Sequence, residues 1–397
     1  MNQTYDIIIL GAGASGMFCA LHLAKKGKKV LVLEHNKYAG KKILKSGGGK
    51  CNFTNKSVKI DNYISKNPRF CHSALSQFTH DDFMSFINKH EIEYEERELG
   101  KLFCKNSSKD IQQMLLEECD NVNFIFNIQF VNASKNDDTF EIEALFKQQF
   151  TSFFCKQFIV ASGSLSFKEL GATNIGHKIA QQFDLKITET KPALVSLEFS
   201  KEDLEVFEGL QGIALPVQLS NQKAMFHEAM LFTHTGISGP CSLQISSYWN
   251  QQETISMNFA LNFNFEDFFK QEQIDNSKKS IENSLAKHFP KKLVHCLLKK
   301  ANSLPSSINN VKDIHIQQVK SLFCDYQLNP KSTSGYDKAE VTCGGVSTKD
   351  INPKTMEAKK QKGLYFIGEV LDVTGWLGGY NFQWAWSSAF ACAKAID

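Results

Sequence analysis

The chain has 397 residues, of which 42% are hydrophobic, so we expect two or three packed units of an ordinary globular protein. Its 45 basic and 42 acidic side chains give a formal charge of +3, which excludes a uniformly basic nucleic-acid binder. Eleven cysteines without a CxxC pair favour reduced thiols over a disulfide framework or a zinc site. Neither a signal-peptide pattern nor a run of about 20 apolar residues occurs, so we expect a cytoplasmic protein that binds no membrane and no metal.

The first sixty residues follow the pattern of a dinucleotide-binding fold. Residues 5–10 form an apolar run that predicts a buried parallel strand, and apolar residues at helical spacing over 17–26 predict a helix. A second predicted strand over 29–33 ends at Glu34. The glycine-rich segment 11–16 joins the first strand to the helix, in the order that the fingerprint requires.

Each residue of this fingerprint has a predicted task. We expect Gly11 to make the tight turn, Gly13 to admit a pyrophosphate and Gly16 to let helix and strand pack closely. Ala14 and Ser15 open the helix, whose unpaired N–H groups should face the phosphates. Glu34 should accept hydrogen bonds from a ribose hydroxyl; the alternative for the whole segment is a flexible glycine loop.

A second glycine cluster, within residues 41–55, indicates FAD instead of a plain NAD site. We interpret it as a loop beside the pyrophosphate, ribityl chain and isoalloxazine, in which lysines neutralise phosphate charge. A solvated basic loop is the alternative. The expected cofactor contacts here are Lys41, Lys42, Ser46, Gly47, Gly48, Cys51 and Asn52. For Cys51, a small buried residue is the competing interpretation to a thiol beside the flavin.

The closing segment is expected to complete the cofactor site. Residues 363–367 predict a strand with a loop at its carboxyl end, where ligands of open α/β sheets bind. A helix predicted over 381–396 should direct its N-terminus at the pyrimidine ring of the flavin. A glycine-rich hairpin before an amphipathic helix is the alternative. The expected contacts are Gly368, Glu369, Asp372 (to a ribityl hydroxyl), Gly378, Gly379, Tyr380 and Asn381.

The sequence patterns in the middle of the chain are less specific for one fold or function. Residues 66–119 are predicted to be mainly helical, and residues 122–160 to form short strands, with Val131 as an adenine contact or a core residue. The pattern is strand-rich over 192–262, then polar, lysine-rich and helical in period over 263–334.

Four motifs, at residues 43–55, 158–166, 231–240 and 368–385, resemble those of the BaiN/RdsA-like (YhiN, "aminoacetone oxidase") FAD-dependent oxidoreductases. Lys50 stands where an arginine is usual. The resemblance implies an α/β fold: a Rossmann-type FAD-binding domain of parallel sheet and β-meander, with an inserted small β-barrel and a helical insert. The implied limits are 1–191, 192–262, 263–336 and 337–397.

No second strand–GxGxxG–helix unit follows the first, so NADH or NADPH should visit the flavin transiently. The resemblance implies reduction of a conjugated carbon–carbon double bond, in an enone thioester or in a uracil base of rRNA. A flavin amine oxidase using oxygen and a non-enzymatic FAD-dependent RNA-binding or structural protein are the rival hypotheses. A basic surface in the insert suits RNA or a solvated helix face; its lysines are Lys278, Lys279, Lys287, Lys291, Lys292, Lys299 and Lys300.

His234 is the candidate catalytic residue. It stands in a turn of small residues and would polarise a carbonyl or pass a proton; a hydrogen-bonded structural histidine is the alternative. Trp376 and Tyr380 should wall or pack the pocket. We expect the substrate pocket between the flavin face and residues 192–262, near His234 and Trp376. The oligomeric state is not indicated.

Overall fold

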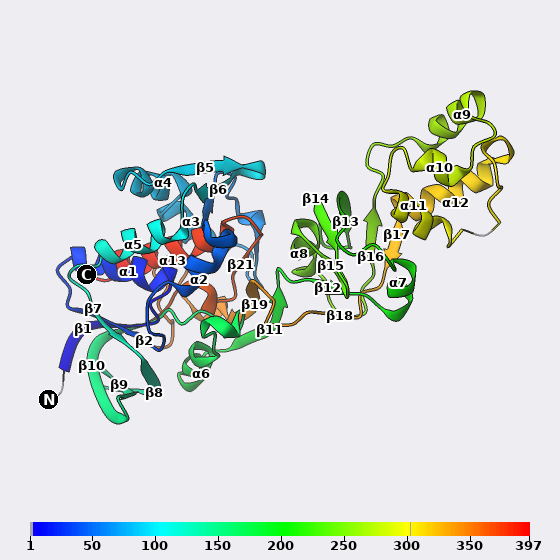
Figure 1. The fold of residues 1–397 in the computed structure, drawn as a ribbon. Helices are drawn as coiled ribbons and strands as arrows, with labels where there is room; N and C mark the ends of the chain where they lie inside the picture. Colours follow the sequence, from blue (N-terminus) through cyan, green and yellow to red (C-terminus); the bar gives the residue numbers. More distant parts are fainter. Residues whose placement is uncertain (1–2, 302) are drawn as a thin grey trace. The chain divides into compact units, whose positions relative to one another are not determined.

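The computed structural model describes residues 3–301 and 303–397, which form two compact units. The first unit comprises the chain up to Pro192 together with Glu340–Asp397, and the second comprises Ala193–Ala339. Figure 1 follows the chain through both units, from the blue strands and helices of the first to its red C-terminal helix.

The first unit is built on a mainly parallel sheet. Strands β1 (Gln3–Leu10), β2 (Val30–Glu34), β7 (Asn123–Phe126), β10 (Gln149–Val160) and β20 (Leu364–Phe366) run parallel, with β1 between β2 and β10. The side chains of residues 7–9 on β1 are fully buried, as a strand covered on both faces requires. Helices α1 (Ala14–Lys25) and α13 (Tyr380–Ala395) lie side by side on this sheet (Figure 1).

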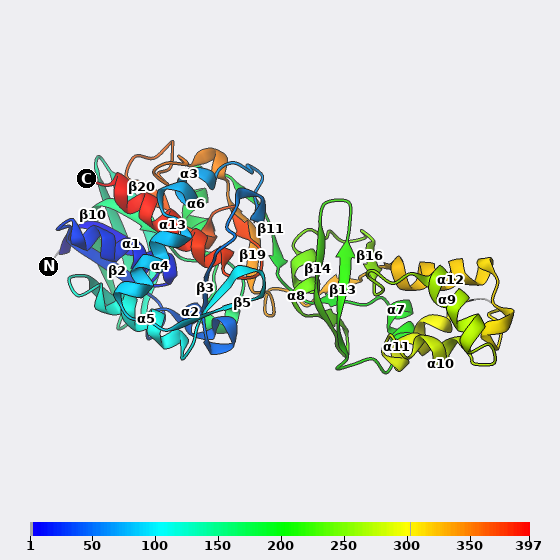
Figure 2. The ribbon, with the colours of Figure 1, turned by 90° about the horizontal axis from the view of Figure 1, so that it is seen from above.

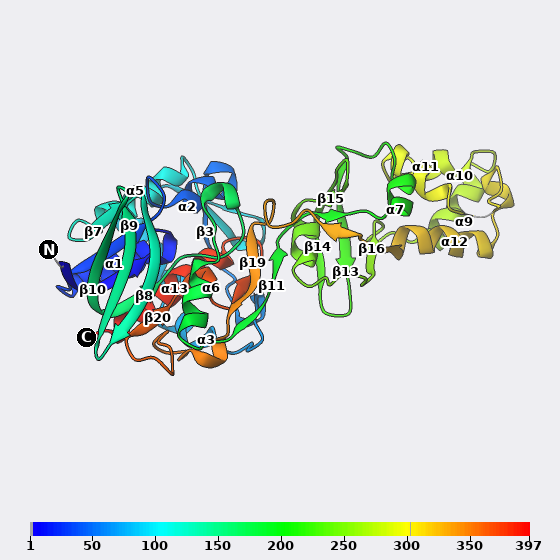
Figure 3. The same ribbon diagram turned by 90° about the horizontal axis from the view of Figure 1, so that it is seen from below.

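Strands β8 (Ile128–Asn136) and β9 (Thr139–Phe146) extend the sheet beyond β10 as an antiparallel meander, visible from below in Figure 3. Residues 137–138 form the turn between β8 and β9. The predicted strands of residues 122–160 are therefore confirmed.

The prediction of a mainly helical segment over residues 66–119 is wrong in part. A hairpin, β5 (Tyr94–Arg97) and β6 (Lys101–Cys104), lies between its helices and pairs through β6 with β3 (Asn52–Asn55). Its charged sequence lacks a strand's apolar alternation, and pairing to a distant strand overrides local propensity. The other elements of this unit are α2 (Lys41–Lys45), β4 (Tyr63–Ile64), α3 (His72–Gln77), α4 (His80–Lys89), α5 (Ser108–Glu117), α6 (Ile175–Gln182), β11 (Ile187–Ala193), β19 (Val341–Val346) and β21 (Thr374–Gly375).

The second unit combines an antiparallel sheet with a helical segment (Figure 2). Its sheet strands and the helices around them are β12 (Leu197–Glu198), α7 (Lys201–Val206), β13 (Ala214–Ser220), β14 (Met225–Phe232), β15 (Gly236–Ser238), α8 (Pro240–Ser246), β16 (Ile255–Asn258), β17 (Tyr326–Leu328) and β18 (Ser332–Thr333). The sheet order is β17-β16-β13-β14-β15-β12-β18, and α8 packs on β13 and β14. The helical segment contains α9 (Phe265–Asp275), α10 (Ile281–Leu285), α11 (Lys291–Leu298) and α12 (Asp313–Cys324), as the period predicts.

The described residues offer neither a membrane-spanning helix nor a cluster of metal ligands. No helix within 3–301 or 303–397 has the length and apolarity that crossing a membrane requires. The same residues contain no group of three or more His, Cys, Asp or Glu side chains placed to hold a metal ion.

Candidate functional site

In the turn between β1 and α1, a side chain would have room at one glycine and would collide with the main chain at the other two. A Cβ atom on Gly11 would lie 2.5 Å from the carbonyl oxygen of Ala161, and one on Gly16 would lie 1.9 Å from that of Gly11. A Cβ on Gly13 would meet nothing within 4 Å. Helix α1 begins after Gly13 with neither a side-chain cap nor an acidic residue in its first turn, which is the arrangement expected of a helix that receives a phosphate group.

Glu34 ties this turn to the end of β2. One carboxylate oxygen, Oε2, accepts the N–H of Ala12 at 2.8 Å, and the other, Oε1, accepts the N–H of Asn36 at 2.8 Å. The side chain is buried. His35 Nδ1 also lies 3.2 Å from Oε1. A carboxylate offers about four lone-pair sites, so Glu34 keeps some capacity to accept a further hydrogen bond.

The two lysines expected to neutralise phosphates have protein partners. Lys42 Nζ lies 2.6 Å from Glu369 Oε2, and Glu369 Oε1 accepts the N–H of Thr342 at 3.2 Å. Lys41 donates to Asn36 Oδ1 at 2.5 Å. Lys42 and Glu369, which are far apart in the sequence, thus form one ion pair.

The segment expected as a loop is partly helical, because residues 41–45 form α2. The glycines follow in a 3-10 turn in which Gly47, Gly48 and Gly49 have φ of 56°, 66° and 89°, conformations that glycine adopts without strain. A Cβ on Gly48 or Gly49 would meet nothing within 4 Å, whereas one on Gly47 would touch Phe103. This turn therefore has an open side, as a loop that receives a ligand requires.

Polar side chains join the end of this turn to the start of α13. The buried amide of Asn55 donates from Nδ2 to the carbonyl oxygens of Gly378 at 2.9 Å and Leu99 at 3.1 Å. Thr54 Oγ1 donates to Gln383 Oε1 at 2.6 Å. Sequence reasoning missed all three of these polar residues, although a polar side chain inside an apolar segment was a usable signal.

Asn52 belongs to the same junction. In the amide orientation that satisfies both of its ends, the Asn52 oxygen accepts the N–H of Gly379 at 3.2 Å. Its nitrogen then donates to the carbonyl oxygens of Thr54 and Leu102. The expected site residues Asn52 and Gly379 are thus brought together by the fold.

The two glycines before α13 are required by chain packing. A Cβ on Gly379 would lie 2.3 Å from the carbonyl oxygen of Thr54, and one on Gly378 would lie 3.0 Å from the side chain of Lys101. Their φ angles are 93° and 118°. We expect these glycines to make room for the flavin, and the packing against Thr54 is a second reason for a glycine at residue 379.

Tyr380 and Asn381 shape the loop that precedes α13. The carbonyl oxygen of Tyr380 accepts the hydroxyl of Tyr63 at 3.0 Å. Asn381 Oδ1 accepts the N–H of Gly375 at 2.8 Å, and its Nδ2 donates to the Gly375 oxygen at 2.9 Å. Helix α13 begins at Tyr380 without a side-chain cap.

Asp372 is a buried carboxylate with partners on one oxygen. Oδ2 accepts the N–H of Lys66 at 3.0 Å and the hydroxyl of Thr188 at 3.1 Å. Burial raises the pKa of the Asp372 carboxyl. Among the residues that the structure describes, none bonds to Oδ1, which leaves that atom for the predicted ribityl hydroxyl.

Gly368 is held through its main chain. Its N–H donates to Ser388 Oγ at 3.0 Å, and its carbonyl oxygen accepts the indole N–H of Trp384 at 3.0 Å. A Cβ on Gly368 would lie 2.6 Å from Ser15 Oγ. The first turn of α1 and the end of β20 therefore approach each other at this glycine.

Cys51 is enclosed by other residues of the chain, and Ser46 is hydrogen-bonded to one of them. The Cys51 side chain is fully buried, and burial raises the pKa of its thiol to about 12 against a smaller lowering by Ser46. The Ser46 hydroxyl donates to the carbonyl oxygen of Ile43 at 2.7 Å. A thiol with that pKa is protonated at neutral pH, which favours the packing interpretation of Cys51.

Val131, the predicted adenine contact, is the extra residue of a bulge in β8. The register with β9 shifts between Phe130 and Asn132, and the Val131 side chain is 45% exposed. The strand begins beside the end of β2, where Asn127 N–H donates to the Asn36 oxygen at 3.1 Å. A bulge frees the main chain of Val131 for a ligand, and exposure argues against the core alternative.

His234 belongs to the second unit, on the turn between β14 and β15, and is exposed. Its ring forms no hydrogen bond with any residue in the described ranges, which argues against a hydrogen-bonded structural histidine.

Trp376, in the first unit, donates its main-chain N–H to the Asn62 oxygen at 2.9 Å, and its ring lies 6.4 Å from that of Tyr380.

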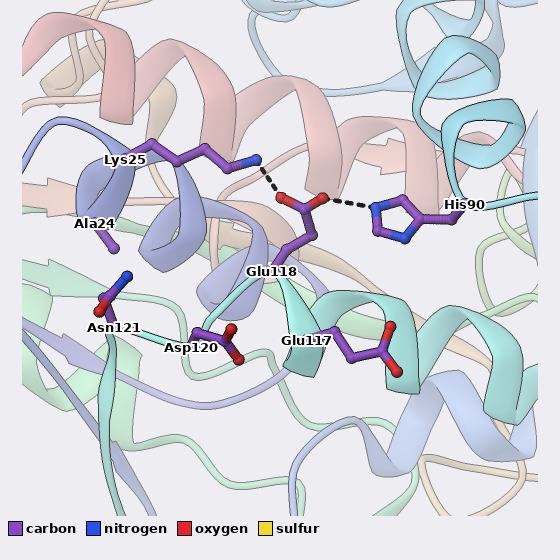
Figure 4. Close-up of a pocket in the computed structure, with 7 residues that line it drawn as sticks. All are labelled: Ala24, Lys25, His90, Glu117, Glu118, Asp120 and Asn121. Carbon is purple, nitrogen blue, oxygen red and sulfur yellow. Dashed lines mark hydrogen bonds and ion pairs between the residues drawn. The ribbon is translucent and has the colours of Figure 1, made fainter.

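A cavity of 340 Å³ lies at the opposite end of α1 from the glycine turn (Figure 4). Glu118 occupies its centre, with Lys25, Lys89 and His90 around the carboxylate. Burial acts to raise the pKa of Glu118, but hydrogen bonds from these three side chains lower it to about 2. Helix α1 has 12 residues and is about 18 Å long, so this ion-pair cluster is separate from the glycine turn.

Comparison with known proteins decides the family. The model of the HI0933-like protein Rossmann domain matches residues 5–395. The chain belongs to the HI0933-like family. Its relatives include a protein of Escherichia coli (strain K12) named ribosomal RNA dihydrouridine synthase, 43% identical over 99% of this chain and 98% of the relative. A Clostridium scindens protein named 3-dehydro-bile acid delta(4,6)-reductase is 28% identical over 98% of both chains.

Among solved structures, the 3-ketosteroid-delta4-(5alpha)-dehydrogenase of Rhodococcus jostii aligns with a TM-score of 0.51 at 11% identity, covering 98% of this chain and 97% of that one. This similarity supports the fold. The predicted family and the Rossmann-type fold class are confirmed. The protein is an FAD-dependent oxidoreductase.

Proposed function

We propose that this protein uses NADH or NADPH to reduce a uracil base in ribosomal RNA to dihydrouracil. The full-length similarity to the Escherichia coli dihydrouridine synthase carries the proposal. The name of the Clostridium scindens relative denotes another reduction, which supports the same reaction type on a different substrate.

The residues of the first unit fit FAD from end to end. The first turn of α1 and the open side of Gly13 would hold the pyrophosphate, with Glu34 on the adenosine ribose. Asp372 Oδ1 would hold the ribityl chain, and the uncapped start of α13 would lie at the pyrimidine edge of the ring. When bound, FAD supplies hydride transfer at N5.

The reaction balances with one nicotinamide and one proton. NAD(P)H provides two electrons and one hydrogen as hydride, which reaches C6 of the uracil, and a proton is added at C5. The C5–C6 double bond becomes a single bond, and NAD(P)⁺ leaves. The protein must therefore provide a proton donor for the base. We propose His234 for this task, because its exposed imidazole forms no hydrogen bond with any residue in the described ranges, and histidine is the side chain that most often transfers protons in catalysis.

The test is to incubate the FAD-loaded protein with unmodified ribosomal RNA and each nicotinamide, then measure dihydrouridine by mass spectrometry of the digested RNA. The proposal expects dihydrouridine that depends on both the nicotinamide and bound FAD. A steroid enone, and an amine with oxygen, serve as competing substrates. Turnover of either with no dihydrouridine in the RNA would overturn the proposal.

A further inference from the structure

The positive charge of this chain is concentrated in one segment of the second unit. Residues 276–312 contain eight lysines and one acidic residue, Glu282, whereas the whole chain has 45 basic and 42 acidic side chains. The rest of the chain therefore holds more acidic than basic groups. A local positive field of this kind on a nearly neutral protein marks a place where a polyanion can bind.

Helix α11 presents the centre of this segment. Its inward face is buried and consists of Leu293, Val294, Cys296 and Leu297. Its exposed residues are Lys291, Lys292 and His295, followed by Lys299 one turn later. Residues spaced by three and four lie on one side of a helix, so these four cationic or titratable side chains share one face. We name this set the α11 basic face.

The neighbouring acidic groups do little to neutralise the α11 basic face. Glu282 Oε1 lies 3.3 Å from His295 Nδ1, and the nearby Glu272 is engaged by Lys287 at 2.8 Å. Lys292 Nζ reaches the carbonyl oxygen of Gly209 at 3.4 Å, beside the exposed Glu208. No carboxylate in the described ranges forms an ion pair with Lys291, Lys292 or Lys299.

The residues in the first turn of α11 are also unfavourable for a helix N-terminus. Cations at a helix N-terminus oppose the helix dipole, yet the first two residues here are Lys291 and Lys292, with no acidic residue and no side-chain cap. Helices α7, α9 and α10 of the same unit each start with a capping Ser or Asn and an acidic first turn. The helix dipole therefore does not favour the two lysines, whereas their positive charge suits phosphate.

We infer that the α11 basic face binds the phosphate backbone of RNA and holds the nucleic-acid substrate while the first unit carries out the reduction. This inference rests on the proposed function for the identity of the RNA. It goes beyond that function because it assigns substrate affinity to a surface formed by residues of the second unit alone. Contacts of this type would depend on phosphate and not on base sequence.

The test uses a triple variant that removes three positive charges, Lys291→Gln with Lys292→Gln and Lys299→Gln, in the full FAD-loaded protein. The matched control removes the same charge from exposed lysines of the first unit, as Lys109→Gln with Lys156→Gln and Lys354→Gln. Binding of protein-free, unmodified ribosomal RNA is measured without turnover across a salt series. Flavin reduction by NAD(P)H reports whether each variant is folded and loaded.

The α11 variant should bind RNA at least about tenfold more weakly at low salt, and the slope of log Kd against log salt should fall by about two, because three phosphate contacts are lost. The control variant should match the wild type, and flavin reduction should be normal in both. Equal weakening in both variants, or an unchanged slope in the α11 variant, would overturn the inference. Wild-type protein that binds ribosomal proteins but no free RNA would overturn it too.

The outcome separates the two proposals. RNA binding that depends on the α11 basic face, without any dihydrouridine produced, would leave the inference standing and contradict the proposed reaction. Dihydrouridine formed equally well by the α11 variant at limiting RNA would support the reaction and contradict the inference.

Discussion

The side-chain amide of Asn55 donates a hydrogen bond to the carbonyl oxygen of Gly378 at 2.9 Å, joining two segments that lie 323 residues apart in the sequence. The same side chain reaches Leu99 and accepts the N–H of Ser57 at 2.8 Å. Asn55 thus connects the end of β3 with the loop of the β5–β6 hairpin and with the approach to α13.

Replacing Asn55 by Ala should lower the free energy of unfolding by about 1 to 3 kcal/mol, because it leaves the buried carbonyl oxygen of Gly378 unpaired and removes two part-buried hydrogen bonds, to Leu99 and Ser57. The FAD dissociation constant should rise with it, since the two halves of the site lose their connection. Thermal denaturation and flavin titration measure the two effects. Asn88→Ala, at an exposed helical position, is the control and should change neither.

Glu34→Gln should weaken FAD binding by about 1.5 to 3 kcal/mol, the scale of hydrogen bonds to a charged acceptor. The amide keeps one acceptor for the N–H groups of Ala12 or Asn36 and loses the charge that favours ribose hydroxyls. Titration with FAD and with FMN separates the effects, because FMN lacks the adenosine ribose. An FAD affinity equal to that of the wild type would remove Glu34 from the ribose site.

Glu118→Gln should destabilise the protein near neutral pH and leave FAD binding unchanged. The carboxyl has a pKa lowered from 4.5 to about 2 in the folded state, so its stabilising contribution is complete above pH 4.5 and is lost as the pH falls toward 2. The difference in melting temperature between wild type and variant should therefore shrink on acidification. A difference that grows at low pH would contradict the assignment of this ion-pair cluster.

His234→Ala should slow oxidation of the reduced flavin by RNA about a hundredfold, while reduction of the flavin by NAD(P)H stays nearly normal. The exposed His227 on β14 provides the control, His227→Ala, which should leave both half-reactions unchanged. Stopped-flow absorbance measures each half-reaction separately. Equal slowing of both by His234→Ala would indicate a structural effect on the second unit.

The contrast between Gly13 and Gly16 tests the cofactor site without reference to catalysis. Gly13 has φ of −81° and free space where a Cβ would stand, so Gly13→Ala should change the stability of the apoprotein by less than about 1 kcal/mol. It should weaken FAD binding by about 1 to 3 kcal/mol, because the methyl group enters the pyrophosphate space. Gly16→Ala should instead destabilise the apoprotein by about 3 kcal/mol. A Gly13→Ala protein with normal FAD affinity would contradict the placement.

Local signals were sufficient to predict the β1–α1–β2 unit. The apolar run of β1, the helical spacing of α1 and the glycines between them lie within 34 residues, so each element is specified by its own neighbours. The helix start near residue 380 was predicted for the same reason. The β5–β6 hairpin was missed because its partner β3 contributes the pairing that its own charged sequence does not indicate.

The side-chain pairings of the site were beyond sequence reasoning. Lys42 and Glu369 each looked like a cofactor contact, and only the fold brings them within 2.6 Å of each other. Gly379 looked like a residue that admits a ligand, yet its nearest neighbour is the main chain of Thr54. Residue types and spacing predict the chemistry available to a site, whereas long-range packing decides which groups are already occupied.

The most direct test is a single-turnover experiment without oxygen. The FAD-loaded protein is reduced with one equivalent of NADPH or NADH and mixed with unmodified ribosomal RNA, and flavin absorbance is followed while the RNA is sampled for dihydrouridine. The account predicts that the flavin is reoxidised and that one dihydrouridine forms for each flavin oxidised. Flavin that stays reduced in the presence of RNA, or that is reoxidised without dihydrouridine, would contradict it.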